Sequence, residues 1–325
     1  MNNNTIKTRV VGVDISTGVT TYAVVGLRGE IIARGSFPTS DYSDVNEYVS
    51  VLSEKIVMLV EENGGYETVR SVGLSAPSGN YVTGSIEYAA NLPWKGHVPL
   101  AAMLRDRLGL AVALGNDAHV TAVGEKTYGA AHGMQNFIVI SLGHGGMGSC
   151  VFMNGMPQLG TDGFAGEIGH TCVVENGRQC NCGHQGCLEE YTSMRGLVKT
   201  AQELIAERGT TPLLSGDLTP QKVADACSQG DEIAVEAFRK TAEFVGVALA
   251  NYASIVDPEA IILTGEMIEY SDWMMDAMCQ AFEENIFQNL RGKVKLLVSP
   301  LDNKERDLLG ASALAWKVKE YSLFK

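Results

Sequence analysis

Short apolar runs alternate with amphipathic segments along most of this chain. Runs rich in β-branched residues and bounded by turn residues predict strands, whereas apolar residues spaced three and four positions apart predict helices. In the stretch 43–62, for example, Val49, Leu52, Ile56 and Val60 fall on one helical face. Such alternation is typical of an α/β protein, so we expect sheets covered by helices.

The pattern predicts two similar sets of elements. The first contains strands at 9–14, 21–27, 30–37, 69–76 and 111–114, and helices at 43–62, 98–109 and 117–128. The second contains strands at 137–142, 150–153, 260–263 and 293–298, and helices at 188–207, 219–228, 231–256, 271–288 and 306–320. Each set opens with two strands joined by a glycine-rich turn, which predicts a duplicated fold with a cleft between two lobes.

Length and composition agree with a two-lobed globular protein. The 325 residues are 45% hydrophobic and 19% charged, enough for a sizeable core. We expect one lobe formed by 1–115 and 310–325 and another formed by 116–309. The net charge of −13 disfavours nucleic-acid binding, because phosphate backbones require a basic surface. The polar start MNNNTIKTR and the lack of a long apolar run predict a cytoplasmic protein without a membrane span.

Three cysteines gather in the glycine-rich stretch CNCGHQGC, which offers no apolar face to bury. Cys180, Cys182 and Cys187, together with His170, supply the three thiolates and one imidazole of a tetrahedral zinc site. Because the protein fills all four positions, the metal would be structural. We therefore expect the hairpin 170–187 to bind zinc.

Two alternatives accompany this interpretation. Cysteines are often only small buried hydrophobes, which is what we expect of Cys150, Cys172, Cys227 and Cys279. His184 is a weaker candidate for the fourth ligand, since the hairpin would have to fold back on itself. The odd total of seven cysteines argues against a disulfide framework.

The glycine-rich turns at 14–20 and 141–149 are candidates for phosphate binding. Tight loops of small residues expose backbone N–H groups that can surround a phosphate, although a plain hairpin is the commoner explanation of one such loop. Asp14 ends its strand beside the first loop, where a carboxylate can hold Mg²⁺ through water or simply cap the turn. Two such loops favour a nucleotide phosphate bound between the halves.

Asn116 and Asp117 follow a strand and open a helix. Residues of this kind at a helix start are most often caps. In an α/β fold, however, a carboxylate at the carboxyl end of a strand faces the ligand crevice. Phosphoryl transfer uses such a carboxylate to accept the proton of the attacking hydroxyl. Asp117 is therefore a candidate general base, and Asn116 a candidate donor to a second hydroxyl.

These features together resemble the ROK family (repressors, open reading frames, kinases) of the actin and hexokinase superfamily. The resemblance spans nearly the whole chain, and its most specific parts are GEIGH at 166–170 and CNCGHQGCLEEYTS at 180–193. GNDA at 115–118 and the segment 75–96 also match. The resemblance implies a two-lobed, actin-like (ribonuclease H-like) ATPase fold, structural zinc, and phosphorylation of a sugar with Mg-ATP.

The resemblance also implies roles for individual residues. Asp117 matches the catalytic base of the family. His170 would bind zinc through one ring nitrogen and face the sugar with the other, since metal ligation fixes the orientation of an imidazole. The expected sugar contacts are Gly79, Asn80, Asn91, Asn116, Glu167, His170 and Glu189.

The nucleotide side departs from the family pattern. The expected nucleotide contacts are Asp14, Ser16, Thr17, Gly18, Gly143, His144, Gly145, Gly265 and Glu266. The first loop reads DISTGV where the family has DIGGTK, and His144 replaces a threonine that faces the terminal phosphate. Glu266 replaces a glycine and adds negative charge near a polyanion. The sugar side retains the residues of the family.

The expected function is ATP-dependent phosphorylation of glucose, a related hexose or an N-acetylhexosamine, by a homodimer or homotetramer. The altered phosphate loops leave open a second hypothesis, a sugar-binding protein without catalysis. A sugar-responsive transcription regulator is a third. Regulators of this family carry a winged helix-turn-helix before the kinase-like body, for which we expect no room ahead of the first strand at residue 9.

Overall fold

The computed structural model describes residues 6–143 and 146–318. The chain divides into two compact units. The first comprises Met1–Gly133, Leu159–Ala165 and Pro300–Lys325, and the second comprises Met134–Gln158 and Gly166–Ser299.

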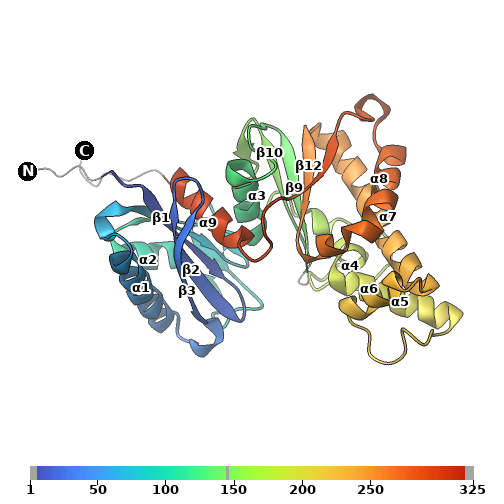
Figure 1. The fold of residues 1–325 in the computed structure, drawn as a ribbon, viewed down its shortest axis with the longest axis horizontal. Coiled ribbons are helices and arrows are strands. Elements are labelled where there is room, and N and C mark those ends of the chain that lie inside the picture. The colour runs from blue at the N-terminus through green and yellow to red at the C-terminus, as the bar shows by residue number, and fades with distance from the viewer. Residues whose placement is uncertain (1–5, 144–145, 319–325) are drawn as a thin grey trace, which may run out of the picture. The chain divides into compact units, whose positions relative to one another are not determined.

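The sheet of the first unit has the strand order β3-β2-β1-β4-β8 (Figure 1). Its strands are β1 (Arg9–Ile15), β2 (Val19–Gly26), β3 (Ile31–Pro38), β4 (Val69–Ser75) and β8 (Ala111–Gly115). β2 is antiparallel to both β1 and β3, while β1, β4 and β8 run parallel. The carboxyl ends of these three parallel strands therefore share one edge of the sheet.

Helices cover both faces of this sheet. α1 (Val45–Glu62) and α2 (Leu100–Leu108) pack against the apolar face that contains Val11 and Val13. α9 (Arg306–Lys317) packs on the opposite face, against Val10, Ala23 and Val25. α9 approaches the strands closely because Gly12 and Gly73 carry no side chain: a Cβ at Gly12 would lie 2.6 Å from the Leu308 carbonyl oxygen.

α3 (Asp117–Tyr128) packs along α9 and so belongs to the first unit. The predicted division, with 1–115 and 310–325 in one lobe and 116–309 in the other, differs from the observed one here. The segment Leu159–Ala165 also joins the first unit. The physical reason is that the α3–α9 interface joins residues far apart in the sequence, which local patterns do not report.

A small antiparallel sheet lies within residues 79–98, between the strand predicted at 69–76 and the helix predicted at 98–109, which begins two residues later than predicted. It consists of β5 (Gly79–Asn80), β6 (Ser85–Glu87) and β7 (His97–Val98). Strands of two or three residues are too short to leave a periodic pattern in the sequence.

The second unit repeats the order of the first, β11-β10-β9-β12-β13. Its strands are β9 (Phe137–Leu142), β10 (Met147–Met153), β11 (Met156–Pro157), β12 (Ala260–Thr264) and β13 (Lys295–Val298). β10 is antiparallel to β9 and β11, while β9, β12 and β13 run parallel. Among the described residues the predicted duplication is therefore confirmed, and β11, where no strand was predicted, completes the second sheet.

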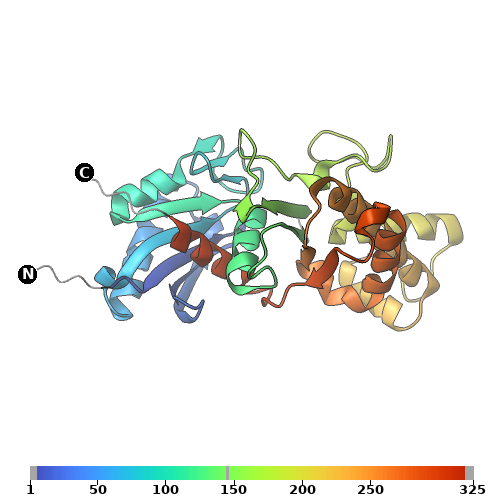
Figure 2. The same cartoon turned by 90° about the horizontal axis from the view of Figure 1, so that it is seen from above.

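Four helices of the second unit share one hydrophobic core with β9 and β12. They are α5 (Met194–Arg208), α6 (Pro220–Ser228), α7 (Glu232–Val256) and α8 (Ser271–Asn285), and the short α4 (Glu189–Thr192) packs against α5 and α7. In Figures 1 and 2 they form the yellow and orange group of this unit. Asp231 caps α7 and Thr219 caps α6, each by accepting hydrogen bonds from backbone N–H groups.

The helix predicted at 188–207 is broken at Ser193. This residue has extended backbone angles (φ −82°, ψ 168°), and its hydroxyl accepts a hydrogen bond from the Gly196 N–H at 3.2 Å. Ser193 thus ends α4 and caps α5. The break brings the acidic residues of α4 beside the basic residues of α5.

Among the residues that the structure describes, no helix has both the length and the apolar character needed to cross a membrane.

Candidate functional site

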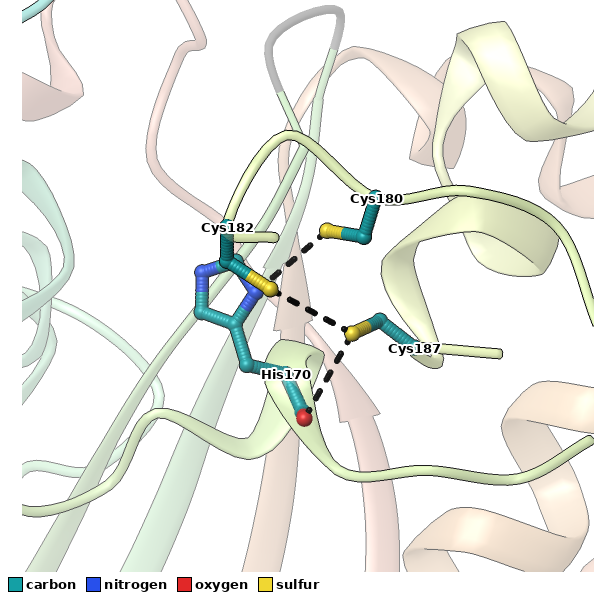
Figure 3. A group of neighbouring side chains, drawn as sticks. All are labelled: His170, Cys180, Cys182 and Cys187. Carbon is teal, nitrogen blue, oxygen red and sulfur yellow. Dashed lines mark hydrogen bonds between the residues drawn. The ribbon is translucent and has the colours of Figure 1, made fainter. Parts of the chain in front are cut away.

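The four predicted zinc ligands come together in the second unit (Figure 3). Their ligand atoms all lie within 4.8 Å of one another. Cys180 Sγ is 3.7 Å from His170 Nδ1, and Cys182 Sγ is 3.6 Å from Cys187 Sγ. Cys180 and Cys187 are buried, whereas Cys182 is exposed. His184 is not in this cluster, so the structure selects His170 as the partner of the three thiols.

The geometry of this cluster suits zinc. Zn–S bonds of about 2.3 Å and Zn–N bonds of about 2.0 Å in a tetrahedron place the ligand atoms about 3.5–3.8 Å apart. The two separations above fall in this range. Burial raises the pKa of Cys180 and of Cys187, so without a cation these thiols are protonated. A bound cation would stabilise the thiolates and favour the same arrangement.

The cluster depends on two short local structures. A 3₁₀ turn at Ile168–His170 presents the imidazole, whose Nδ1 faces the sulfur atoms while Nε2 points away (Figure 3). A β-bridge pairs Cys172 with Cys187, and the Cys180 N–H donates to the His184 carbonyl at 2.9 Å. These contacts close the hairpin and bring its thiols to the imidazole.

Two carboxylates flank the metal cluster. Glu189 is 8% exposed, and its Oε1 accepts from Cys180 Sγ at 3.1 Å and lies 3.8 Å from His170 Nδ1. Glu167 precedes the 3₁₀ turn and is exposed. Partial desolvation raises the pKa of Glu167, His170 opposes this rise, and the charge of Glu189 adds to it. Glu167, His170 and Glu189 thus form one polar group within the second unit.

A second polar group lies at the carboxyl edge of the first sheet. Asp14 is the penultimate residue of β1 and lies beside Ser75 of β4 in the strand register. Burial, and then the charges of Asp307 and Asp117, raise the pKa of Asp14 to about 7, while Ser75 and Arg306 act in the opposite direction. Carboxylates from β1, from the start of α3 and from the start of α9 therefore converge, as the crevice rule for α/β sheets predicts.

Asn116 and Asp117 both make the cap contacts considered for them. Asn116 Oδ1 accepts from the His119 N–H at 2.7 Å, and Asp117 Oδ1 accepts from the Ala118 N–H at 2.8 Å. Asp117 nevertheless remains exposed, and Asn116 is partly exposed. A capping role and a role in chemistry are compatible for Asp117, because its carboxylate has a second oxygen.

The remaining first-unit candidates differ in their surroundings. Asn80 is buried; its Nδ2 donates to the Asp162 carbonyl at 2.9 Å and its Oδ1 accepts from the Val82 N–H at 2.9 Å. Gly79 leaves no space for a side chain, since a Cβ there would lie 2.5 Å from the Gly115 carbonyl oxygen. Asn91 is an exposed residue of the loop that follows β6. Gly79, packed against the Gly115 carbonyl, and Asn80 therefore lie at the edge of the first sheet beside Asn116.

The first phosphate-loop candidate is a tight turn between β1 and β2. The Ser16 N–H donates to the Val19 carbonyl at 3.0 Å, and the Val19 N–H donates to Ser16 Oγ at 3.2 Å. Thr17 and Gly18 are exposed at its tip. The hydroxyl of Ser16 is thus used to close the turn, whereas Thr17 is open to solvent.

The second phosphate-loop candidate adjoins the turn after β12. Gly265 has φ +97°, and a Cβ there would lie 2.4 Å from the Leu142 carbonyl oxygen, so only glycine fits. A Cβ at Gly143 would lie 2.8 Å from Glu266 Oε2, which places this carboxylate beside the loop. Two of the predicted nucleotide contacts, His144 and Gly145, lie outside the described residues.

The structure adds residues that the sequence did not single out. Glu190 is a buried carboxylate paired with Arg195 and Lys199. Arg178 lies in the hairpin and donates to the Glu190 carbonyl at 2.6 Å and to both carboxylate oxygens of Glu203. Asp307 joins Asp14 and Asp117. Of these residues, only Glu190 could have been singled out from the sequence, because it follows directly after Glu189 in the EEYTS run.

The repeated five-stranded sheet defines the actin-like, ribonuclease H-like class of α/β proteins. The model of the ROK family matches residues 10–318. The chain belongs to this family, which confirms the resemblance.

Individual relatives are similar over most of their length. A glucokinase from Streptomyces coelicolor is 32% identical over 316 residues, which cover 94% of this chain and 96% of that protein. The crystal structure of a ROK family glucokinase from Streptomyces griseus, in complex with glucose and AMPPNP, is 30% identical with a TM-score of 0.76 and covers 95% of this chain and 100% of that one. A xylose repressor from Caldicellulosiruptor bescii is 27% identical over 226 residues, 68% of this chain and 56% of that protein.

Proposed function

We propose that this protein is a sugar kinase that phosphorylates a hexose, glucose or a close relative, with Mg-ATP. The observation that carries the proposal is the group of carboxylates at the carboxyl edge of the first sheet, where Asp117 is exposed beside Asp14. The similarity to glucokinases along nearly the full chain supports the same assignment.

In this proposal, Asp117 accepts the proton of the attacking sugar hydroxyl as the terminal phosphoryl group leaves ATP. Asp117 suits the task because its Oδ1 is fixed by the Ala118 N–H, which orients the carboxylate while the side chain stays exposed. Asp14 would hold the magnesium ion of the nucleotide through water, and a nearby dication would favour its charged form.

Glu167, His170 and Glu189 would bind the hydroxyls of the sugar, and Asn80, Asn91 and Asn116 would supply further contacts. A hydroxyl both donates and accepts, so carboxylate acceptors together with an imidazole suit a polyol. His170 would use Nδ1 for zinc and leave Nε2 for the sugar, in agreement with the direction of its ring. Zinc bound by Cys180, Cys182, Cys187 and His170 would stabilise the hairpin.

The test is a coupled assay of ADP release across a panel of hexoses and N-acetylhexosamines. We expect turnover with at least one aldohexose and dependence on Mg²⁺. Assembly of the protein as a homodimer or homotetramer stays a prediction, which analytical ultracentrifugation would test.

A specific observation favours a second candidate, a sugar-binding protein without catalysis. Glu266 lies beside Gly143 in the second phosphate-loop candidate, where its negative charge opposes a nucleotide phosphate. In that case calorimetry would detect hexose binding, while the coupled assay would detect no ADP release with any sugar. A sugar-responsive regulator would additionally bind DNA, which the net charge of −13 disfavours.

A further inference from the structure

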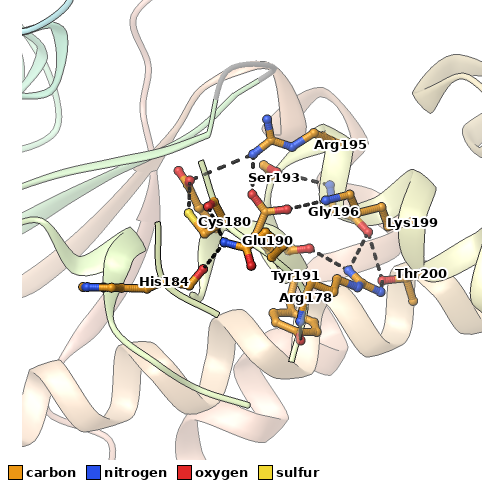
Figure 4. A network of polar contacts seen from close by, with 12 residues as sticks. Arg178, Cys180, His184, Glu190, Tyr191, Ser193, Arg195, Gly196, Lys199 and Thr200 are labelled. Atoms are coloured by element: carbon orange, nitrogen blue, oxygen red, sulfur yellow. Dashed lines mark hydrogen bonds and ion pairs between the residues drawn. The ribbon is translucent and has the colours of Figure 1, made fainter. Parts of the chain in front are cut away.

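A buried carboxylate without a part in the proposed chemistry lies next to Glu189. Glu190 is 1% exposed, and a carboxylate so deeply buried requires charged partners. Two cations of α5 provide them: Arg195 Nη2 lies 2.5 Å from Glu190 Oε1, and Lys199 Nζ lies 2.5 Å from Glu190 Oε2 (Figure 4). Glu190 therefore anchors the first two turns of α5.

Arg195 also reaches Glu189. Its Nη2 lies 3.9 Å from Glu189 Oε1, the oxygen that accepts from Cys180 Sγ at 3.1 Å. The other oxygen, Oε2, lies against Gly146, where a side chain would collide with it. The carboxylate of Glu189 is thus contacted by a thiol, a guanidinium and a glycine backbone, and Arg195 is the one cation of α5 that bridges Glu189 and Glu190 among the described contacts.

Arg178 of the hairpin 170–187 also holds α4 and α5 together. Arg178 donates to the carbonyl oxygens of Glu190 and Gly196 at 2.6 and 3.1 Å, and its guanidinium stacks on the Tyr191 ring at 4.4 Å (Figure 4). These contacts fix the α4–α5 corner at Ser193. Arg195 follows this corner directly, so its position relative to α4 is set by the corner rather than by a regular helix.

We propose that Arg195, held by Glu190, is a positioning residue for sugar binding that fixes the orientation of Glu189. The inference rests on the proposed role of Glu189 as a ligand of sugar hydroxyls. The charges of Glu189 and Glu190 are balanced by those of Arg195 and Lys199. Loss of the Arg195 charge leaves two adjacent carboxylates with one cation, and Glu189 turns away from the position set by the bridge.

The experiment compares Arg195→Met, which keeps an unbranched stem without charge, with Arg195→Lys. Hexose affinity is measured by calorimetry without nucleotide, together with zinc content and the separate KM values for sugar and ATP. We expect Arg195→Met to bind the hexose about tenfold more weakly, with zinc retained and the KM for ATP changed by less than about twofold. Arg195→Lys keeps the positive charge and should recover part of the affinity. The recovery should be incomplete, because an ammonium cannot bridge two carboxylates as a guanidinium does.

Arg208→Met is the matched control, since Arg208 lies on the same helix and, among the described residues, forms an exposed ion pair with Glu236 at 4.0 Å rather than a contact with Glu189 or Glu190. Its hexose affinity should equal that of the wild type. Lys199→Met removes the other partner of Glu190 but keeps the bridge, so its effect on hexose affinity should be smaller than that of Arg195→Met.

Several results would overturn the inference. Unchanged hexose affinity in Arg195→Met would do so. A raised KM for ATP together with unchanged hexose affinity would also do so, because Arg195 would then act on ATP rather than on the sugar. Should Arg195→Met lose zinc or fail to fold, Arg195→Lys decides: weaker hexose binding with zinc retained supports the inference, and wild-type affinity contradicts it. If the wild type itself binds no hexose, the proposed function fails, and with it the role assigned to Glu189.

Discussion

Glu266 Oε2 lies beside Gly143, so close that a Cβ on this glycine would be only 2.8 Å away. Both residues belong to the second unit, at the ends of β12 and β9. A carboxylate is thus placed next to one of the two glycine-rich loops that we propose to bind nucleotide. The negative charge of the Glu266 side chain opposes the phosphates of a nucleotide there.

Glu266→Gly is therefore expected to tighten ATP binding about fivefold, or ~1 kcal/mol. The gain should shrink at high salt, because screening shortens the range of the repulsion. Calorimetry at two ionic strengths measures both effects. Glu269→Gly is the matched control, since Glu269 is exposed in the same 3₁₀ helix. An equal gain in the control, or tight ATP binding by the sugar-free wild type, contradicts this account.

Asp117→Asn is expected to lower kcat on the order of 10²–10⁴-fold while hexose affinity stays within about twofold. An amide oxygen can still accept from the Ala118 N–H but cannot take a proton from the sugar hydroxyl. Steady-state kinetics and calorimetry separate the two quantities. Asp106→Asn, at an exposed position of α2, should behave as the wild type. Wild-type turnover by Asp117→Asn would contradict the assignment of Asp117 as the general base.

Cys182→Ser is expected to lose both zinc and hexose binding, while the helical content of the two units largely persists. The reason is that two of the ligands lie close to proposed sugar-binding residues. His170 belongs to the turn that follows Glu167, and Cys187 lies two residues before Glu189, so loss of the metal frees both carboxylates. Metal analysis, calorimetry and circular dichroism give the three readouts. Cys172→Ser, which removes an exposed thiol outside the cluster, should retain both. A zinc-free variant with normal hexose affinity would show that the hairpin serves stability alone.

Asp14→Asn is expected to stabilise the ligand-free protein above pH 7. The pKa of Asp14 is about 7 in the folded protein, against 3.8 for an ordinary aspartate, so the folded state binds the proton more tightly. The free energy of unfolding therefore falls as the pH rises from about 4 to about 7, and Asn removes this loss. Because Asp14 is partly exposed, the gain at pH 8 should be ~1–2 kcal/mol, a few degrees in Tm, and should vanish at pH 4.

Thermal unfolding of wild type and Asp14→Asn at both pH values tests this linkage. Mg-ATP should reduce the difference if Asp14 binds the magnesium ion, because the dication favours the ionised carboxylate. Equal stability of the two proteins at pH 8 without ligand would contradict the raised pKa.

The sequence by itself determined the class of fold and much of the candidate site. The alternation of apolar runs and amphipathic segments was enough for the duplicated α/β order, because the longer strands and the helices each leave a periodic pattern of apolar residues. Cys180, Cys182 and Cys187 lie within eight positions, and such closeness in the chain makes a common cluster easy to predict. Asn116 and Asp117 were found because they follow a strand in a parallel sheet, whose carboxyl ends share an edge.

Tertiary structure alone decided several other features. α3 joins the first unit through its contact with α9, which begins 178 positions after the last residue of α3. Ser193 could have continued a helix or capped one, and only the packing of α4 and α5 selected the break. His170 rather than His184 meets the thiols because the β-bridge between Cys172 and Cys187 fixes the register of the hairpin. Distances in space also set the ion pairs of Glu190 with Arg195 and Lys199, and they bring together the three carboxylates of Asp14, Asp117 and Asp307.

A one-dimensional pattern records which side chains are present. The strength of a charge interaction depends on separation and burial, which only the folded chain sets.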